Sequence, residues 1–342
     1  MKIYEISIIP LSGFGTPIKG DTLFGHFCWQ LAYNKDLVEG GIKKTLQNYA
    51  KKPFAVFSSA YPKNLADYDK YIFKRPNIPS SWIFKSKGNR EKQYSVNKIN
   101  KKKKWMIVNN DFQIDFDESK FINDEELYKE CFVKPDKQKD LENNILKSFS
   151  QTHNTINRLT NTTGSGDIFA PYIIDKDFYK SGIKLLLFVC IDTEMTDIEK
   201  IKQGLTNIGC FGFGMRASSG SGRFSVCESK EIKIPERDDV NACYTLAPCI
   251  PEKNEFNYEN IFFTPFTRFG KHGDTAARNP FKKPVIMADE AAVFKTNDKN
   301  VFKKPYIGKA LNDISYTIPE TISQGYAPYL PLKLENPNEK SN

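Results

Sequence analysis

One glycine-rich stretch, GCFGFGMRASSGSGR at residues 209–223, holds the residue types best suited to binding phosphate. Glycine lets a backbone approach a ligand closely, and successive backbone amides in turn conformations form a nest for an anion. Arg216 and Arg223 can each donate two hydrogen bonds to phosphate oxygens, and the nearby serine hydroxyls add further donors. The stretch therefore predicts a clamp for a nucleic-acid backbone. A flexible connection between a helix and a strand is the alternative.

The same stretch does not fit a nucleotide-cofactor site. Residues 212–217 match the G-x-G-x-x-A pattern, but that fingerprint needs a strand before it and a helix after it. Here the pattern of apolar residues predicts the reverse order. The sequence also lacks the G-x-x-x-x-G-K-[ST] pattern of a P-loop. We therefore expect no cofactor.

Catalytic chemistry has few candidate residues. RNA cleavage uses a general acid or base that titrates near neutral pH and a cation that stabilises the transition state. The three histidines are His26 on an apolar helix face, His153, and His272 beside Arg268 and Lys271. The seven cysteines contain no C-x-x-C pair, and the acids of residues 111–130 lack metal-ligand spacing. We expect no catalytic residue and no metal site.

Composition favours an anionic partner. Lys and Arg number 50 against 41 Asp and Glu, which gives a net charge of +9. Such an excess favours nucleic acid as the partner, with a simple basic surface as the alternative. The hydrophobic fraction of 39% is enough for a folded core. No signal-peptide region and no membrane-spanning run occur, so we expect a cytoplasmic protein without a membrane partner.

Elements predicted on both sides of the glycine-rich stretch would position it. Apolar patterns predict strands near residues 3–9, 54–57, 183–191 and 223–226. They predict helices near residues 23–31, 36–49 and 198–208. The expected helix signals are Asp21 or Thr22 as one N-cap, a capping box from Thr196 to Glu199, and Gly209 at a helix end.

This order predicts an α+β fold. The sequence strand, helix, strand, strand, helix, strand is that of a ferredoxin-like (RRM-like) domain, with a long insertion between its second and third strands. The insertion is highly charged: nine basic residues and one acid over 82–110, then eight acids and two lysines over 111–130. We predict tandem ferredoxin-like domains. One spans 1–236 with a hairpin or thumb insertion at about 80–175, and a degenerate, strand-rich one spans 240–342.

Several segments resemble the RAMP superfamily of CRISPR proteins. The glycine-rich loop that ends in G-x-G-R-F is the superfamily's signature. The narrower likeness is to the Csm-four subunits, the Cas-five group of type III-A effector complexes. It is carried by GTPIKGDTLFGHFCW (15–29), PFAVFSSAYP (53–62), HNTINRLTNTTGSGDIFAP (153–171), NPFKKPVIMADEAAVF (279–294) and GYAPYLPLKL (325–334). Residues 63–150 are the most divergent part.

The resemblance implies a non-catalytic RNA-binding subunit. It would hold the repeat-derived 5′ handle of the CRISPR RNA, cap the effector, and serve antiviral defence. The implied partners are that RNA, the large Cas-ten polymerase or cyclase subunit, and the repeated backbone RAMP subunits, rather than a second copy of itself. The alternative is a RAMP endoribonuclease that processes repeat RNA.

The resemblance also implies the residues that contact the RNA. Arg216, Ser218, Ser219, Gly220 and Arg223 would clamp handle phosphates, and Lys19, Asp21 and Thr22 would line the same groove. Asn154, Asn157, Arg158, Thr160 and Thr163 would lie on the thumb. Ile156 or Leu159 could wedge between nucleotides, with ordinary core packing as the alternative for both.

Overall fold

The computed structural model describes residues 1–84, 90–132, 144–164, 166–256, 260–273, 276 and 278–335. Its first sheet has the strand order β12-β1-β11-β2, and every neighbouring pair is antiparallel. These strands are β1 (Lys2–Pro10), β2 (Ala55–Phe57), β11 (Leu185–Ile191) and β12 (Phe224–Ile232), and the short β3 (Tyr61–Pro62) also pairs with β11. In chain order the strands run fourth, first, third, second, as a β-α-β-β-α-β domain requires.

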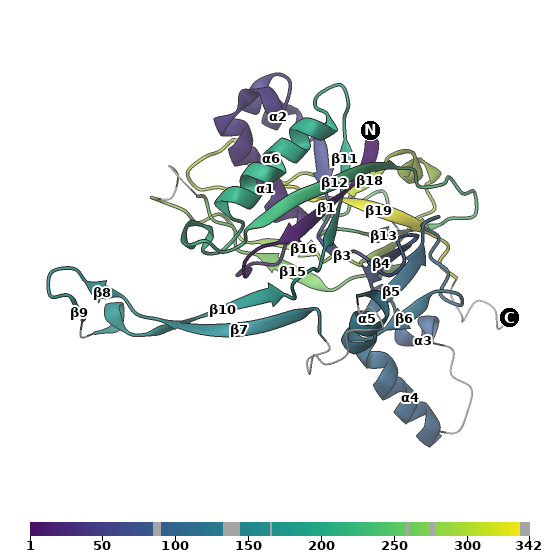
Figure 1. Cartoon of the computed structure of the whole chain (residues 1–342). Helices are drawn as coiled ribbons and strands as arrows, with labels where there is room; N and C mark the ends of the chain where they lie inside the picture. Colours follow the sequence, from purple (N-terminus) through teal and green to yellow (C-terminus); the bar gives the residue numbers. More distant parts are fainter. Residues whose placement is uncertain are drawn as a thin grey trace.

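Helices cover one face of this sheet (Figure 1). They are α1 (Gly20–Tyr33), α2 (Gly41–Tyr49) and α6 (Ile198–Phe211), with a short 3-10 turn, η1 (Lys35–Leu37), before α2. The single helix expected near 36–49 is therefore split. Phe24, Phe27 and Leu205 are fully buried between the helices and the sheet. At Gly204 of α6 a Cβ would lie 2.3 Å from the Phe27 ring, so a side chain there would push the two helices apart.

The helix caps differ from the sequence-based expectation. α1 follows Lys19, and no side chain caps it. The N-cap of α6 is Asp197, whose carboxylate accepts a hydrogen bond from the Lys200 amide at 2.9 Å. The Thr196 hydroxyl instead donates to the Leu37 carbonyl, so the predicted capping box is wrong and a single cap by Asp197 takes its place one residue later.

The end of α6 lies further along the chain than predicted. Gly209 is inside the helix, and a Cβ there would lie 2.1 Å from the Phe224 carbonyl oxygen. Gly209 is therefore required by close packing of α6 on β12. Gly212, with φ of 107°, follows the last helical residue.

The insertion, expected at about 80–175, begins earlier and ends later, because β4 starts at Lys70 and β10 ends at Tyr179, and it contains two units. The first is a three-stranded sheet of β4 (Lys70–Lys74), β5 (Trp105–Asn109) and β6 (Lys120–Ile122), with α3 (Ser80–Ile83), α4 (Arg90–Lys102) and α5 (Asp124–Cys131). The second is the thumb, a long hairpin of β7 (Leu146–His153) and β10 (Tyr172–Tyr179) that projects from the body (Figure 1). Near its tip are β8 (Ile156–Asn157), β9 (Thr162–Thr163) and the 3-10 turn η2 (Asp167–Phe169).

The second half repeats the strand order of the first. Its sheet runs β14-β17-β13-β19-β18, built from β13 (Ala242–Thr245), β14 (Ile261–Phe262), β17 (Val293–Lys295), β18 (Tyr306–Gly308) and β19 (Tyr326–Leu332). If β18 is set aside and this sheet is read from β19 to β14, the strands again run fourth, first, third, second in chain order. All pairs are antiparallel. A second hairpin, β15 (Pro265–Arg268) with β16 (Val285–Ala288), lies between the second and third strands, as the thumb does in the first half. The predicted fold class is confirmed.

The second copy lacks the usual covering helices. Between β17 and β19 the one helical element of the described residues is a 3-10 turn, η6 (Lys299–Lys303). The two halves instead share a core. One cluster of buried side chains includes Phe73 of β4, Phe188 of β11, Tyr244 of β13 and Leu330 of β19. The proposed boundary between residues 236 and 240 remains a prediction.

Candidate nucleic-acid interface

The glycine-rich loop, residues 212–223, connects α6 to β12 through a short 3-10 turn, η3 (Ala217–Ser219). Its path depends on backbone conformations that most residues avoid. Gly222 has φ of 72°, and a Cβ there would lie 2.1 Å from the Phe213 carbonyl oxygen. Gly220 has φ of 82° but has open space around it. The loop is thus a specific structure rather than a flexible connection.

Arg216 occupies the left-handed region without being glycine, with φ of 63°. A residue with a Cβ is disfavoured there by roughly 1–2 kcal/mol, and such outliers occur often at functional sites. Its guanidinium Cζ lies 5.3 Å from the centroid of the Tyr172 ring at the start of β10. The same ring stacks on His153, with centroids 5.6 Å apart. Arg216 therefore connects the glycine-rich loop to the thumb.

The first loop, residues 11–18, supports the glycine-rich loop from below. The Ser12 hydroxyl accepts a hydrogen bond from the Arg223 amide at 2.9 Å, and the Thr16 hydroxyl accepts one from the Met215 amide at 2.9 Å. The Gly13 carbonyl accepts from the Gly222 amide at 2.8 Å. These contacts fix the positions of the loop backbone and leave the Arg216 side chain outside.

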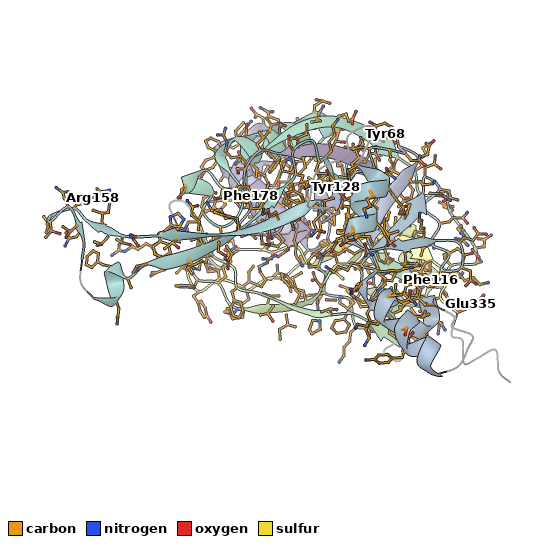
Figure 2. The ribbon with its side chains drawn as sticks, turned by 60° about the horizontal axis from the view of Figure 1, so that its bottom comes forward. Tyr68, Phe116, Tyr128, Arg158, Phe178 and Glu335 are labelled. Atoms are coloured by element: carbon orange, nitrogen blue, oxygen red, sulfur yellow. The ribbon has the colours of Figure 1, made fainter. Side chains whose placement is uncertain are left out.

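The base of the thumb joins the same first loop. Phe14 and Asp177 exchange two backbone hydrogen bonds of 2.9 Å. The Phe178 ring lies where a Cβ at Gly13 would be 2.5 Å away. Figure 2 labels Phe178 where the thumb meets the body. The first loop, the glycine-rich loop and the thumb therefore form one continuous surface.

The predicted clamp residues come together on this surface. Arg216, Ser218, Ser219, Gly220 and Arg223 are all exposed. Within the described residues neither guanidinium has a carboxylate partner, so both charges are available to a ligand. Ser221, also expected to offer a hydroxyl, is buried with 2% exposure and cannot contact RNA directly.

The thumb residues lie at the far end of the hairpin, where Figure 2 labels Arg158. Asn154, Arg158, Thr160 and Thr163 are exposed, and Asn157 is half-buried. Ile156 is 62% exposed and Leu159 is 94% exposed. The core-packing alternative for these two is therefore wrong, whereas their role as a wedge remains a prediction. The tip lies away from the clamp residues, and the length of the thumb hairpin separates the two groups.

The charges of Lys19 and Asp21 are paired inside the protein. The Lys19 ammonium contacts the Asp289 carboxylate, lies 3.0 Å from Glu290 Oε2, and sits 4.1 Å from the centroid of the Phe266 ring. Asp21 accepts two hydrogen bonds from the Arg268 guanidinium, at 2.6 and 3.0 Å. Both pairs join the first half to the second. The structure therefore favours a structural role for them over the expected place in an RNA groove, which remains untested.

Thr22 is half-buried, and its hydroxyl oxygen has no partner among the described residues. Its expected contact with RNA also remains a prediction.

Two buried carboxylates share the lysines at this junction. Glu290 contacts both Lys19 and Lys74. Burial alone would raise the pKa of Glu290, but a hydrogen bond with Asp289 and the two ammonium charges hold it well below its usual range. Burial, and then Glu290, raise the pKa of Asp289 to about 6.

The histidines do not assemble a nuclease site in the described residues. His26 Nε2 accepts a hydrogen bond from the Gly214 amide at 3.0 Å, and burial, with the charge of Lys282, lowers its pKa to about 4. His272 is 7% exposed and its Nε2 is 2.8 Å from the Ser315 hydroxyl. His153 stacks on Tyr172, and its Nε2 is buried without a partner in the described part of the chain.

Sequence reasoning missed Tyr172, Ser12 and Thr16. Tyr172 directly follows the thumb segment that carried the resemblance, but an aromatic residue gives no signal of the cation that will lie over it. Ser12 and Thr16 are ordinary loop residues until the fold brings residue 215 beside them. The sequence places His26 on an apolar helix face, but its contact with the glycine-rich loop has no sequence signal.

The described residues contain neither a metal-binding cluster nor a membrane-spanning helix. No group of three or more His, Cys, Asp or Glu side chains there is arranged to hold a metal ion. None of the helices in those ranges has the length and apolar character needed to span a membrane.

No family model matches the sequence, and no curated protein matches it. Solved structures do match. One is the Csm3-Csm4 subcomplex in the type III-A CRISPR-Cas interference complex, at 15% identity over 98% of this chain and 100% of that chain, with a TM-score of 0.56. Others are the Csm1-Csm4 cassette with cA4 (16% identity, TM-score 0.55) and with pppApA (17%, 0.54), each over 98% of this chain and 99% of the other. Over essentially its whole length, this chain has the fold of subunits seen in type III-A CRISPR structures.

Proposed function

We propose that this chain is the Csm4-type subunit of a type III CRISPR effector complex and that it holds the repeat-derived 5′ handle of the CRISPR RNA without cleaving it. Csm4 is the one subunit named in both kinds of matched complex, and the match covers whole chains. The identity of 15–17% supports the fold, and the site supports the function.

The observation that carries the proposal is the convergence of three segments around Arg216. The first loop fixes the glycine-rich backbone, the thumb supplies Tyr172, and the exposed guanidiniums of Arg216 and Arg223 have no carboxylate partner in the described residues. Such a surface binds phosphates through charge and backbone amides and does not need to read bases. Its position beside the thumb suits a strand that continues along the hairpin toward Arg158.

The partners follow from the same proposal. The chain would assemble in the cytoplasm with a large polymerase or cyclase subunit and with repeated backbone subunits, as the matched complexes pair Csm4 with Csm1 and Csm3. The domain division at 236–240 is part of this proposal.

Sequencing the RNA that co-purifies with the tagged protein from its native host tests the proposal. We expect RNAs that share one repeat-derived 5′ segment followed by varied guides, in a fraction that also contains a large second subunit. A heterogeneous cellular RNA mixture would contradict the proposal. The RNA ends should be the same for His26→Ala, His153→Ala and His272→Ala, whereas loss of maturation in any of them would favour the endoribonuclease alternative.

A further inference from the structure

A second group of exposed aromatic side chains lies in the second half of the chain. Phe269 is 72% exposed, Phe281 is 64% exposed and Tyr316 is 70% exposed. They are brought together by the loops around the β15–β16 hairpin, because Lys271 bridges to Phe281 and Lys282 bridges to Ser315. Large exposed apolar side chains gathered in one place indicate a binding surface.

Lysines accompany these rings. The Lys271 ammonium lies 4.8 Å from the centroid of Phe281, and the Lys283 ammonium lies 5.7 Å from the centroid of Tyr316. We refer to Phe269, Lys271, Phe281, Lys283 and Tyr316 as the aromatic–lysine patch. The one carboxylate found against it in the described residues is Asp313, 2.8 Å from Lys283. Arg268 nearby is paired with Asp21, so the patch itself carries two lysines against one carboxylate and has a net positive charge.

The patch adjoins the glycine-rich loop through α1. His26 of α1 accepts the Gly214 amide on one side. The loop beside the patch also reaches α1, since a Cβ at Gly273 would lie 4.0 Å from Trp29 Nε1. Figure 1 places β15 and β16 on the thumb side of the body. The two surfaces are therefore neighbours, with α1 between them.

We propose that the aromatic–lysine patch is a second binding site for single-stranded RNA, which extends the track that begins at the glycine-rich loop. This inference rests on the proposed function, since it takes the loop as the first site. Single-stranded nucleic acid binds to surfaces that combine cationic side chains with rings on which bases stack. The patch has rings beneath lysine ammonium groups and a net positive charge, which match a surface that binds single-stranded nucleic acid. An apolar protein interface fits less well, because such interfaces are depleted in lysine.

The test measures binding of synthetic single-stranded RNAs to the full chain. The RNAs carry the repeat-derived segment and are shortened stepwise from either end. Phe269→Ala together with Phe281→Ala should weaken binding of the longest RNA by about tenfold, since loss of a stacking ring costs that order of affinity. When the RNA is shortened from the end that reaches the patch, the shortened RNAs should bind the variant and the wild type equally, because they no longer contact the patch. Phe281→Leu, which keeps the apolar volume, should retain the fold and show the same direction of change.

A matched control exists on another part of the molecule. Tyr68 is 69% exposed and lies under the Lys63 ammonium at 5.6 Å, so Tyr68→Ala removes the same kind of pair away from the patch. It should leave RNA affinity unchanged. Equal losses for Tyr68→Ala and Phe281→Ala would overturn the proposal.

The remaining outcomes distinguish failure of the patch proposal from failure of the proposed function. If Arg216→Ala with Arg223→Ala weakens binding but the patch variants do not, the patch is not an RNA site and the proposed function stands. If neither set of variants changes binding, the proposed function itself fails. If patch variants keep RNA affinity and lose another subunit from the purified complex, the patch is a protein interface and the inference is overturned.

Discussion

The guanidinium Cζ of Arg216 lies 5.3 Å from the centroid of the Tyr172 ring, and this contact joins two segments that are 44 residues apart in the chain. Arg216 is held there by a strained backbone, with φ of 63°. The ring limits the rotation of the side chain and leaves the donors at its edge free. We therefore expect Tyr172 to order Arg216 before any RNA is bound.

Replacing Tyr172 tests that ordering. Tyr172→Ala should weaken RNA binding two- to fivefold, because an exposed cation–π contact contributes about 0.5–1 kcal/mol. Tyr172→Phe should bind like the wild type, since it keeps the ring. In the Arg216→Ala background Tyr172→Ala should add nothing, and fluorescence anisotropy with a labelled RNA measures the four variants and the wild type. Independent, additive losses would show that the ring acts on RNA without Arg216.

The glycine-rich loop offers a matched pair of substitutions. Gly222→Ala meets both a positive φ of 72° and a Cβ contact of 2.1 Å with the Phe213 carbonyl oxygen. Gly220→Ala meets a positive φ of 82° in open space, so its cost should be only about 1–2 kcal/mol. Chemical denaturation should therefore show a clearly larger loss of stability for Gly222→Ala, accompanied by weaker RNA binding. Similar values for the two would contradict the close packing of this loop.

Lys19 should matter for stability rather than for binding. Lys19→Met leaves the carboxylates of Asp289 and Glu290 together without the cation that contacts both, and breaking a buried ion pair costs about 3–5 kcal/mol. The control is Lys2→Met, which removes an exposed pair with Glu231 at 2.9 Å and should cost far less, because water screens an exposed ion pair. Denaturation curves give both values. A stable Lys19→Met protein with weakened RNA binding would restore Lys19 to the RNA groove.

His26 should make stability depend on pH. Its folded pKa of about 4 lies below the ordinary 6.5, so between these values the unfolded chain binds a proton that the folded chain does not. The contribution of His26 to stability then falls as the pH falls from 6.5 to 4, by about 3 kcal/mol at 1.36 kcal/mol per unit, while Asp289, whose folded pKa is raised to about 6, contributes in the opposite direction. His26→Gln can still accept the Gly214 amide but cannot titrate. Its stability should fall less than that of the wild type over this range, and parallel profiles would contradict a buried neutral His26.

The sequence predicted the first half well for physical reasons. The strand at 185–191 is a short continuous apolar run, which is typical of a buried strand. The helix at 198–211 has apolar residues at helical spacing, which identifies it as a helix with one buried face. The thumb was harder to delimit, because in β7 (Leu146–His153) six consecutive residues are exposed and no alternation marks the strand. Without that signal the charged residues of the α3–α5 unit merged with the hairpin into one expected insertion.

The site was predicted in part. Glycine with arginine and serine identified the loop, and Arg216 and Arg223 are exposed as expected. The roles of Lys19 and Asp21 could not be found, because their partners Asp289, Glu290 and Arg268 are more than 240 residues away in the chain. Long-range ion pairs leave no local pattern in a sequence.

The most direct test of the RNA clamp is the salt dependence of RNA binding by Arg216→Ala with Arg223→Ala. The matched control, Lys230→Ala with Lys233→Ala, removes two exposed charges near the far end of β12. The account predicts that the arginine variant binds RNA more weakly. The slope of log affinity against log salt should also be smaller by up to about two, because fewer counterions are released on binding when two phosphate contacts are lost. The lysine variant should keep the wild-type slope. An unchanged slope for the arginine variant would contradict the clamp.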